Sequence, residues 1–233
     1  ISGLPSPDLP GVEPLGAART VSIVDRYIDT AAAALRAAGL AARVRTSSGD
    51  APTRLTVKSL LPAGGGMAHR RLEMEDSLPG EAPGDEAPWA GAPCAAVPEA
   101  TAPAINPALW PPSPARDAIV TVVGSASLIV IATIRQRRFQ RDIRVDSARV
   151  ELSLDDIEST GANGAVDRWV ELEAELIPTQ AGPPDAIDGL DGLAELEGLR
   201  SIEALGRRLA ERPDLAAATS GKLDRALGLA GPR

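Results

Sequence analysis

The segments Leu40-Ala-Ala-Arg-Val-Arg45 and Glu171-Leu-Glu-Ala-Glu175 carry charged side chains at alternate positions. In a β-strand, residues i and i+2 share a face, so each segment predicts a strand with one charged face. The pattern recurs in Arg54-Leu-Thr-Val-Lys58, Arg71-Leu-Glu73 and Glu151-Leu-Ser-Leu-Asp155. A sheet that closes on itself can turn such faces inward, where cations and carboxylates together hold a polyanion and its metal ions.

The composition favours one domain, or one domain with a tail, and a locally basic site. The chain has 233 residues, 44% of them apolar but only 2% aromatic, so Ala, Leu and Val must build the core. The formal charge of −8 argues against a nucleic-acid or membrane partner. The basic residues are nearly all Arg, which suits bidentate phosphate contacts, although a GC-rich genome would give the same bias.

Other sequence features exclude several function classes. The single Cys94 allows neither an internal disulfide nor a thiolate metal cluster, and nothing near the single His69 orients it for catalysis. The uncharged run 118–134 is shorter than the ~20 residues of a membrane span and predicts a helix end followed by a buried strand. No signal peptide is visible, and we expect a cytoplasmic protein.

The predicted strands share apolar–polar alternation and turn-rich boundaries, and their hairpin-like spacing predicts antiparallel neighbours. They span residues 19–28, 40–46, 53–60, 67–77, 127–139, 147–157 and 166–177.

Helices and loops are predicted from caps and composition. Asp29 or Thr30 is expected to cap a helix over 30–38 that ends at Gly39, and we prefer helix capping to a catalytic role for Asp29. Residues 1–18 predict a loop. The proline-rich segment 79–114 predicts a flexible insertion. Further helices are expected at 115–122, 186–210 and 214–227.

The order of these pieces resembles that of the CYTH superfamily, also called triphosphate tunnel metalloenzymes, over about residues 8–228. The motifs that carry the resemblance are Tyr27-Ile-Asp-Thr30, a helix, Leu40-Ala-Ala-Arg-Val-Arg45, Leu55-Thr-Val-Lys58, Arg71-Leu-Glu73, Arg135-Gln-Arg-Arg138, a strand ending at Asp155, and Glu171-Leu-Glu-Ala-Glu-Leu176.

The resemblance implies an α+β fold built on an antiparallel, eight-stranded closed barrel whose tunnel binds triphosphate compounds with a divalent metal. Family members include inorganic triphosphatases, thiamine triphosphatases and one class of adenylate cyclases. A CYTH-like barrel domain is then expected over residues 1–228. Segment 79–114 would be its flexible insertion, and the helices of 186–228 would pack on the barrel.

The resemblance also implies roles for individual residues. Carboxylates would hold Mg²⁺ or Mn²⁺. The positions that match the family's metal-binding carboxylates are Glu73, Asp155, Glu171 and Glu173, and Asp156 and Glu175 are weaker candidates. The positions that would bind and activate the triphosphate are Arg43, Arg45, Lys58, Arg71 and Arg138. Arg135 is a further substrate-binding candidate, although it alternates with Arg138 and would need a bulge to share its face.

The chain departs from the family pattern at its start. It has no N-terminal Glu-x-Glu-x-Lys strand, which in the family supplies metal ligands. Either the sequence is a truncated part of a longer CYTH-CHAD protein or the protein has lost this strand, and we expect the barrel to lack its first strand. The missing strand would expose sheet edges. Little activity is therefore expected of this chain.

Alternative interpretations remain open at this point. The alternating charges are also typical of a solvent-facing sheet, and Arg207, Arg208 and Lys222 of the tail are expected to be solvated. Metal-dependent hydrolysis of tripolyphosphate or a similar compound is the leading hypothesis, ahead of a cyclase. A non-catalytic polyphosphate- or nucleotide-binding module is the alternative. The tail resembles the end of CYTH units that continue into a CHAD domain, so such a domain is a candidate partner.

Overall fold

The computed structural model describes residues 12–49, 51–60, 73–78, 105–177 and 188–228, with backbone alone for 188–195. Its strands form one antiparallel eight-stranded sheet in the order β5-β4-β3-β2-β6-β7-β8, with β1 paired to β6. The strands are β1 (Val12–Pro14), β2 (Arg19–Thr30), β3 (Leu40–Ser47), β4 (Arg54–Ser59), β5 (Glu73–Ser77), β6 (Leu128–Val145), β7 (Ala148–Gly161) and β8 (Val166–Leu176).

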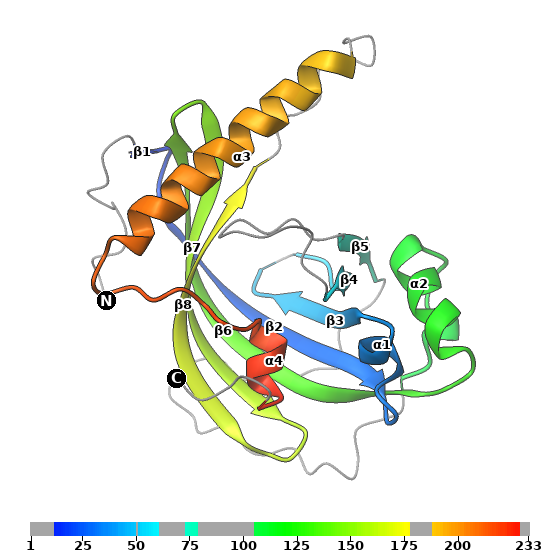
Figure 1. Cartoon of the computed structure of the whole chain (residues 1–233). Helices are drawn as coiled ribbons and strands as arrows, with labels where there is room; N and C mark the ends of the chain where they lie inside the picture. The colour runs from blue at the N-terminus through cyan, green and yellow to red at the C-terminus, as the bar shows by residue number, and fades with distance from the viewer. Residues whose placement is uncertain (1–11, 50, 61–72, 79–104, 178–187, 229–233) are drawn as a thin grey trace.

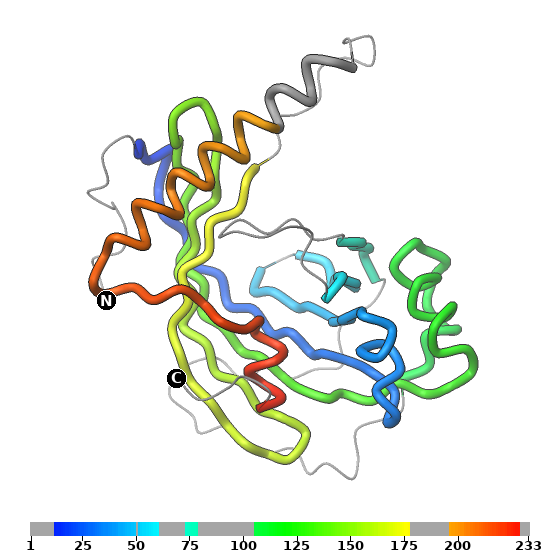
Figure 2. Tube along the Cα trace, viewed as in Figure 1, coloured from blue at the N-terminus to red at the C-terminus, as the bar shows by residue number. Residues whose placement is uncertain are grey.

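The sheet is strongly curved, and helices lie on both of its faces (Figure 1). The short helix α4 lies in the hollow of the sheet, whereas α1 and α2 lie at one end of it and α3 crosses the other end (Figure 2). The helices are α1 (Ala34–Ala37), α2 (Pro114–Val123), α3 (Asp188–Ala210) and α4 (Lys222–Ala226), with a 3₁₀ turn, η2 (Pro107–Leu109).

The predicted α+β class with an antiparallel eight-stranded sheet is confirmed. Strands β5 and β8 end the ladder, and no hydrogen-bonded pairing joins them among the described residues, so backbone hydrogen bonds do not close the sheet there. The eighth strand is β1, which falls where the sequence predicts a loop. Its three residues pair with the far end of β6, which is longer than expected.

Apolar side chains on the convex face form two separate cores. Leu55 and Val57 of β4 are fully buried and pack with Ile119 of α2 and Leu35 of α1. At the other end of the sheet, Leu205 of α3 is fully buried and completes a cluster built by strands β6 and β7, whose members are Ile143, Val145, Ala148, Val150 and Leu152. Both cores bury the apolar residues that alternate along the strands. The charged residues between them therefore lie on the concave face.

Helix α2 confirms the helix predicted at 115–122. The Ser113 hydroxyl accepts a hydrogen bond from the Arg116 N–H at 3.2 Å, and Pro114 occupies the first helical turn. The segment just before α2 also belongs to the fold, since Ile105 bridges to Leu128 of β6. The remaining part of the predicted insertion, 79–104, lies outside the described residues, as do 67–72 of the strand predicted at 67–77.

Two predicted helices are much shorter than expected. The helix predicted at 30–38 occupies only Ala34–Ala37, because β2 continues to Thr30 before the chain turns. The helix predicted at 214–227 is reduced to α4, and the chain that leads into it from α3 is not helical. Within the described ranges, no helix has the length and apolar character needed to cross a membrane.

Asp29 caps α1, as predicted. Its Oδ1 accepts hydrogen bonds from the N–H groups of Thr30 at 2.7 Å and Leu35 at 2.8 Å, and its Oδ2 accepts one from Arg36 at 3.1 Å. The side chain is buried, so its carboxylate is the acceptor that satisfies these N–H groups.

Replacing Asp29 with Ala should lower the free energy of unfolding by about 2 kcal/mol or more, because buried N–H groups lose their acceptor. Urea unfolding of the parent and of Asp29→Ala measures this change. Asp117→Ala, which removes an exposed carboxylate from α2, is the matched control and should stay close to the parent. Equal stability of parent and Asp29→Ala would show that the cap contributes nothing.

Candidate functional site

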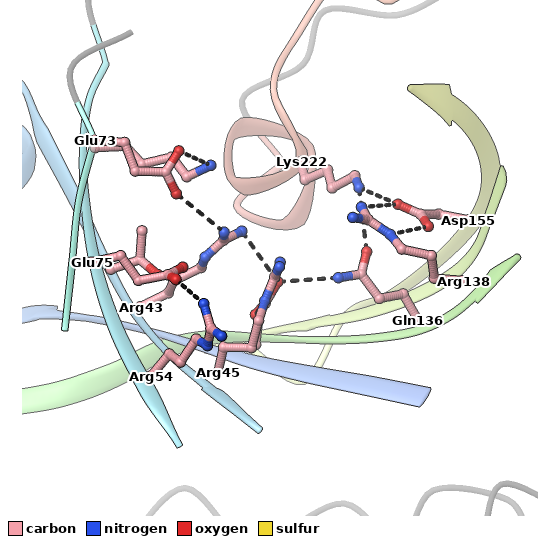
Figure 3. Close-up of polar contacts among 12 residues, drawn as sticks. Arg43, Arg45, Arg54, Glu73, Glu75, Gln136, Arg138, Asp155 and Lys222 are labelled. Carbon is pink, nitrogen blue, oxygen red and sulfur yellow. Dashed lines mark hydrogen bonds and ion pairs between the residues drawn. The ribbon is translucent and has the colours of Figure 1, made fainter. Parts of the chain in front are cut away.

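Polar and charged side chains from seven strands, β2 to β8, and from α4 converge on the concave face (Figure 3). Each strand contributes alternate residues, which is why the polar groups collect on one side while the apolar groups pack under helices. The residues labelled in Figure 3 are Arg43 and Arg45 of β3, Arg54 of β4, Glu73 and Glu75 of β5, Gln136 and Arg138 of β6, Asp155 of β7, and Lys222 of α4. Their ion pairs and hydrogen bonds add Asp25 of β2, Lys58 of β4 and Glu173 of β8.

Asp25 is the centre of the first cluster and is completely buried. Its two carboxylate oxygens accept hydrogen bonds from Nε and Nη2 of Arg45, each at 2.7 Å. Gln136 donates to the same carboxylate at 3.2 Å and Arg43 at 3.4 Å. Burial opposes ionisation of Asp25, but Arg43 and Arg45 outweigh it, so the pKa of Asp25 is lowered. Asp25 is therefore a fixed anion beneath two arginines.

The neighbouring strands β4 and β5 add a second row of ion pairs. Lys58 Nζ lies 2.9 Å from Glu73 Oε2, and Arg54 pairs with Glu75. Burial and the positive charge of Arg43 lower the pKa of Lys58, although Glu73 partly offsets them. Cations are thus crowded closely enough here to disfavour one another, which is the condition under which an added anion is stabilised.

A second cluster is built around Asp155. Nε and Nη2 of Arg138 donate to its two carboxylate oxygens, both at 2.7 Å, and the same Nη2 also donates to Glu173 at 2.7 Å. Lys222 Nζ donates to Asp155 at 2.6 Å and lies 3.1 Å from Glu173. Burial would raise the pKa of Asp155, but Arg138 and Lys222 lower it.

Gln136 links the two clusters. Its amide nitrogen donates to Asp25 at 3.2 Å, and its amide oxygen accepts from Lys222 at 3.2 Å. Burial would lower the pKa of Lys222, but Glu173 and Asp155 raise it, so Lys222 is held as a cation between the clusters. The site is therefore one connected network of alternating charges.

Arg43 retains an unused donor inside this network. The residue is 8% exposed, and its Nε is buried without a hydrogen-bond partner. Buried polar groups are nearly always paired, so this N–H is free to donate to an acceptor that a ligand on the concave face brings. Burial opposes the charge of Arg43, but Asp25 and Glu73 raise its pKa, so the donor stays cationic.

A small cavity of about 70 Å³ opens beside Arg43, between β3, β4 and α4. It is lined by Tyr27, Arg43, Lys58 and, from α4, Lys222 and Asp224.

The carboxylates suit a hard divalent cation by their chemistry but are engaged by protein cations. Asp155 faces Glu171 across β7 and β8, and Glu173 lies two residues further along the same face. Among the residues that the structure describes, no group of three or more His, Cys, Asp or Glu side chains is arranged to hold a metal. Arg138 and Lys222 take the oxygens of Asp155 and Glu173, so a bound cation would have to displace Lys222 from them.

The structure brings together most of the residues that the sequence predicts for the site. Arg43, Arg45, Lys58 and Arg138 share the concave face with Glu73, Asp155, Glu171 and Glu173. Arg71 lies outside the described residues.

Arg135 does not join them, and its assignment is corrected. It pairs with Val24 and Glu158 in an uninterrupted register, three residues from Arg138, and therefore lies on the opposite face. The bulge that would bring Arg135 to the concave face is absent, since the register shift between β2 and β6 falls at Tyr27 and Ile28 instead.

Five residues of the site were not predicted as site residues from the sequence, namely Asp25, Arg54, Glu75, Gln136 and Lys222. Asp25 alternates with Tyr27 on β2, and Gln136 alternates with Arg138 on β6, so both could have been placed on the charged face by spacing alone. Lys222 is the clearest error. The sequence predicts it to be solvated, yet its side chain is only 10% exposed and lies in the network. Its position depends on how α4 packs, for which no local signal exists.

Comparison with known proteins agrees with this architecture. The model of the CYTH domain family matches residues 15–201, most of the chain. The chain belongs to the CYTH domain family. No curated protein matches it.

Several solved structures are similar to this CYTH chain. One is a candidate adenylyl cyclase from Hippeastrum described as having a dominant triphosphatase activity (16% identity, TM-score 0.45, 90% of this chain and 83% of that chain). Another is a candidate adenylate cyclase from Bacillus halodurans, with 15% identity, a TM-score of 0.45, and coverage of 92% of this chain and 98% of that chain. A third is a protein from Pyrococcus horikoshii, with 15% identity, a TM-score of 0.38, and coverage of 85% of this chain and 89% of that chain.

The lowered pKa of Asp25 predicts an acid-dependent loss of stability. Because the folded pKa lies below the unfolded one, ionised Asp25 stabilises the fold fully above about pH 4, and this contribution is lost as the pH falls through the folded pKa. Asp25→Asn should cost roughly 3 kcal/mol near neutral pH and flatten the acid limb of the stability curve.

Urea unfolding at several pH values tests this expectation. Asp146→Asn, which removes an exposed carboxylate from the β6–β7 turn, controls for the change in net charge. A stability curve of Asp25→Asn parallel to that of the parent down to low pH would contradict the assignment.

Proposed function

We propose that the concave face of this CYTH protein binds a triphosphate compound, such as inorganic tripolyphosphate, and hydrolyses it with the help of a divalent metal ion. The observation that carries the proposal is the buried, unpaired Nε of Arg43 within a crowd of cations. A polyphosphate offers many acceptor oxygens and several negative charges, which this surface is built to compensate.

Arg43, Arg45, Lys58 and Arg138 would bind the phosphate oxygens. Planar guanidinium groups match phosphate geometry and can exchange a carboxylate partner for a phosphate. Asp25 stays ionised beneath Arg43 and Arg45 and holds both in orientation before substrate arrives. Such preorganised cations cost little reorganisation when charge develops on the transferred phosphoryl group. Arg71 stays a proposed ligand on sequence grounds.

Glu73, Asp155, Glu171 and Glu173 would hold Mg²⁺ or Mn²⁺, whose oxygen preference they satisfy. The family is metal-dependent in general, which supports this assignment. When bound, the metal would neutralise phosphate charge during in-line attack by water. Lys222 would then release Asp155 and Glu173, and its ammonium group would be available for a phosphate oxygen. A carboxylate of the cluster would orient the attacking water.

A non-catalytic polyphosphate-binding module is the second candidate. One observation favours it: Lys222 takes the oxygens that a metal would need, and the described carboxylates form no metal-holding group. Such a module would bind tripolyphosphate through the same arginines but would release no phosphate from it.

Removing a phosphate-binding arginine should impair the reaction strongly. Arg43→Gln and Arg138→Gln are each expected to lower kcat/KM for tripolyphosphate by roughly ten- to a hundredfold, the equivalent of one charge-assisted hydrogen bond. Phosphate release and tripolyphosphate binding by calorimetry are measured side by side, with the fold checked by thermal unfolding.

Arg137→Gln is the matched control, because Arg137 neighbours Arg138 on β6 but stacks on Phe139 on the other face. It should retain the parent kcat/KM. Binding without phosphate release in the parent would favour the non-catalytic module. Absence of both would refute the site.

Metal removal gives an independent prediction. A chelator should stop phosphate release, and added Mg²⁺ or Mn²⁺ should restore it. Glu173→Gln should raise the metal concentration needed for half-maximal rate about tenfold, because one charged ligand is lost. Release that continues undiminished in chelator would contradict the metal-dependent mechanism.

A further inference from the structure

The helix α4 is fastened to β8 by Arg225, one turn beyond Lys222. Arg225 Nε donates a hydrogen bond to Asp167 Oδ2 at 2.6 Å, and its guanidinium lies over the ring of Trp169, 4.3 Å from the centroid. The arginine side chain is 19% exposed, so both contacts are partly desolvated. An ion pair and a cation–π contact thus act on one guanidinium.

Trp169 extends this contact into the proposed site. Its indole Nε1 donates to Glu171 Oε2 at 3.0 Å. Asp167, Trp169 and Glu171 are alternate residues of β8 and share its concave face. Arg225 therefore fixes the indole that orients one of the proposed metal-binding carboxylates.

The apolar contacts of α4 bring the helix close to the sheet. Leu223 and Ala226 are buried in a cluster with Tyr27 and Ile157. A Cβ added to Gly161 at the end of β7 would lie 2.9 Å from the carbonyl oxygen of Ala226, so helix and strand approach each other as nearly as their backbones allow.

We propose that Arg225 is a positioning residue for the phosphate site, an inference that rests on the proposed function. Through α4 it places the ammonium group of Lys222 among Asp155, Glu173 and Gln136. Through Trp169 it sets the orientation of Glu171. One side chain outside the charged network thereby controls a phosphate-binding cation and a metal-binding carboxylate together.

A purely structural role would give a different result. A partly exposed ion pair and a cation–π contact are each worth about 1 kcal/mol, so a purely structural role predicts a modest loss of stability and an unchanged site. The test therefore needs readouts at the site as well as the free energy of unfolding.

The experiment follows Trp169 directly. In a Trp89→Phe, Trp110→Phe background, Trp169 is the sole remaining tryptophan of the three in the chain. Arg225→Gln in this background should shift the Trp169 emission to longer wavelength and increase its quenching by acrylamide. In the unaltered background, Arg225→Gln should raise KM for tripolyphosphate roughly tenfold and weaken Mn²⁺ binding measured by calorimetry.

Two further variants sharpen the test. Arg225→Lys keeps a cation that can reach Asp167 and the indole face, so it should restore most of the parent KM and emission. Arg212→Gln is the matched control, since Arg212 pairs with exposed Asp214 on the same tail and should leave every site readout unchanged. Gly161→Ala, which displaces α4 without touching Arg225, should reproduce the rise in KM and the weaker Mn²⁺ binding.

Unchanged emission, KM and Mn²⁺ affinity in Arg225→Gln would overturn the proposal. So would an emission shift accompanied by parent values of both KM and Mn²⁺ affinity. If the parent chain releases no phosphate, the proposed hydrolysis fails, but Trp169 emission and Mn²⁺ affinity still decide whether Arg225 positions the site.

Discussion

Compensation of buried charge is the constraint on which the rest of this structure depends. A completely buried carboxylate such as Asp25 is stable only because arginines surround it, and Asp155 depends in the same way on Arg138 and Lys222. The register of neighbouring antiparallel strands places Asp25 opposite Arg45 and Asp155 opposite Arg138, whereas Lys222 reaches Asp155 from α4, which lies in the hollow of the curved sheet (Figure 1). The two apolar cores on the convex face supply the stability that lets the concave face remain charged.

The same compensation explains how such a surface can act on a polyanion. Each arginine that the structure describes in this network has a carboxylate partner, yet Arg43 keeps one unpaired N–H. The network can therefore still donate a hydrogen bond to a ligand. In the proposed function, exchanging carboxylate oxygens for phosphate oxygens would preserve the hydrogen bonds while freeing acidic groups for a metal ion. In the proposed function Lys222 would exchange its carboxylate partners for phosphate oxygens, while α4, which carries it, stays anchored on the sheet by buried Leu223 and Ala226.

Sequence reasoning was strongest where a property repeats along one strand. The alternation in β3 and β8 predicted both the strands and the face on which Arg43, Arg45, Glu171 and Glu173 lie. The sequence did not predict the position of a side chain where that position depends on packing between distant segments. The arginines of β6 lie at both odd and even positions, so spacing alone could not choose between Arg135 and Arg138, and only the register with β2 and β7 does so. Lys222 was misjudged because a helix of five residues has almost no intrinsic stability and forms only against the sheet.

The arginines on both faces of β6 have a consequence for comparing this chain with distant relatives. An alignment displaced by one position along β6 still places Arg137 over Arg138, so matching arginines do not establish the correct correspondence. The apolar residues further along the strand do, because Ile143 and Val145 are fully buried under α3, whereas the intervening Arg144 is exposed. The end of β6 remote from the charged residues is therefore the better guide to evolutionary equivalence.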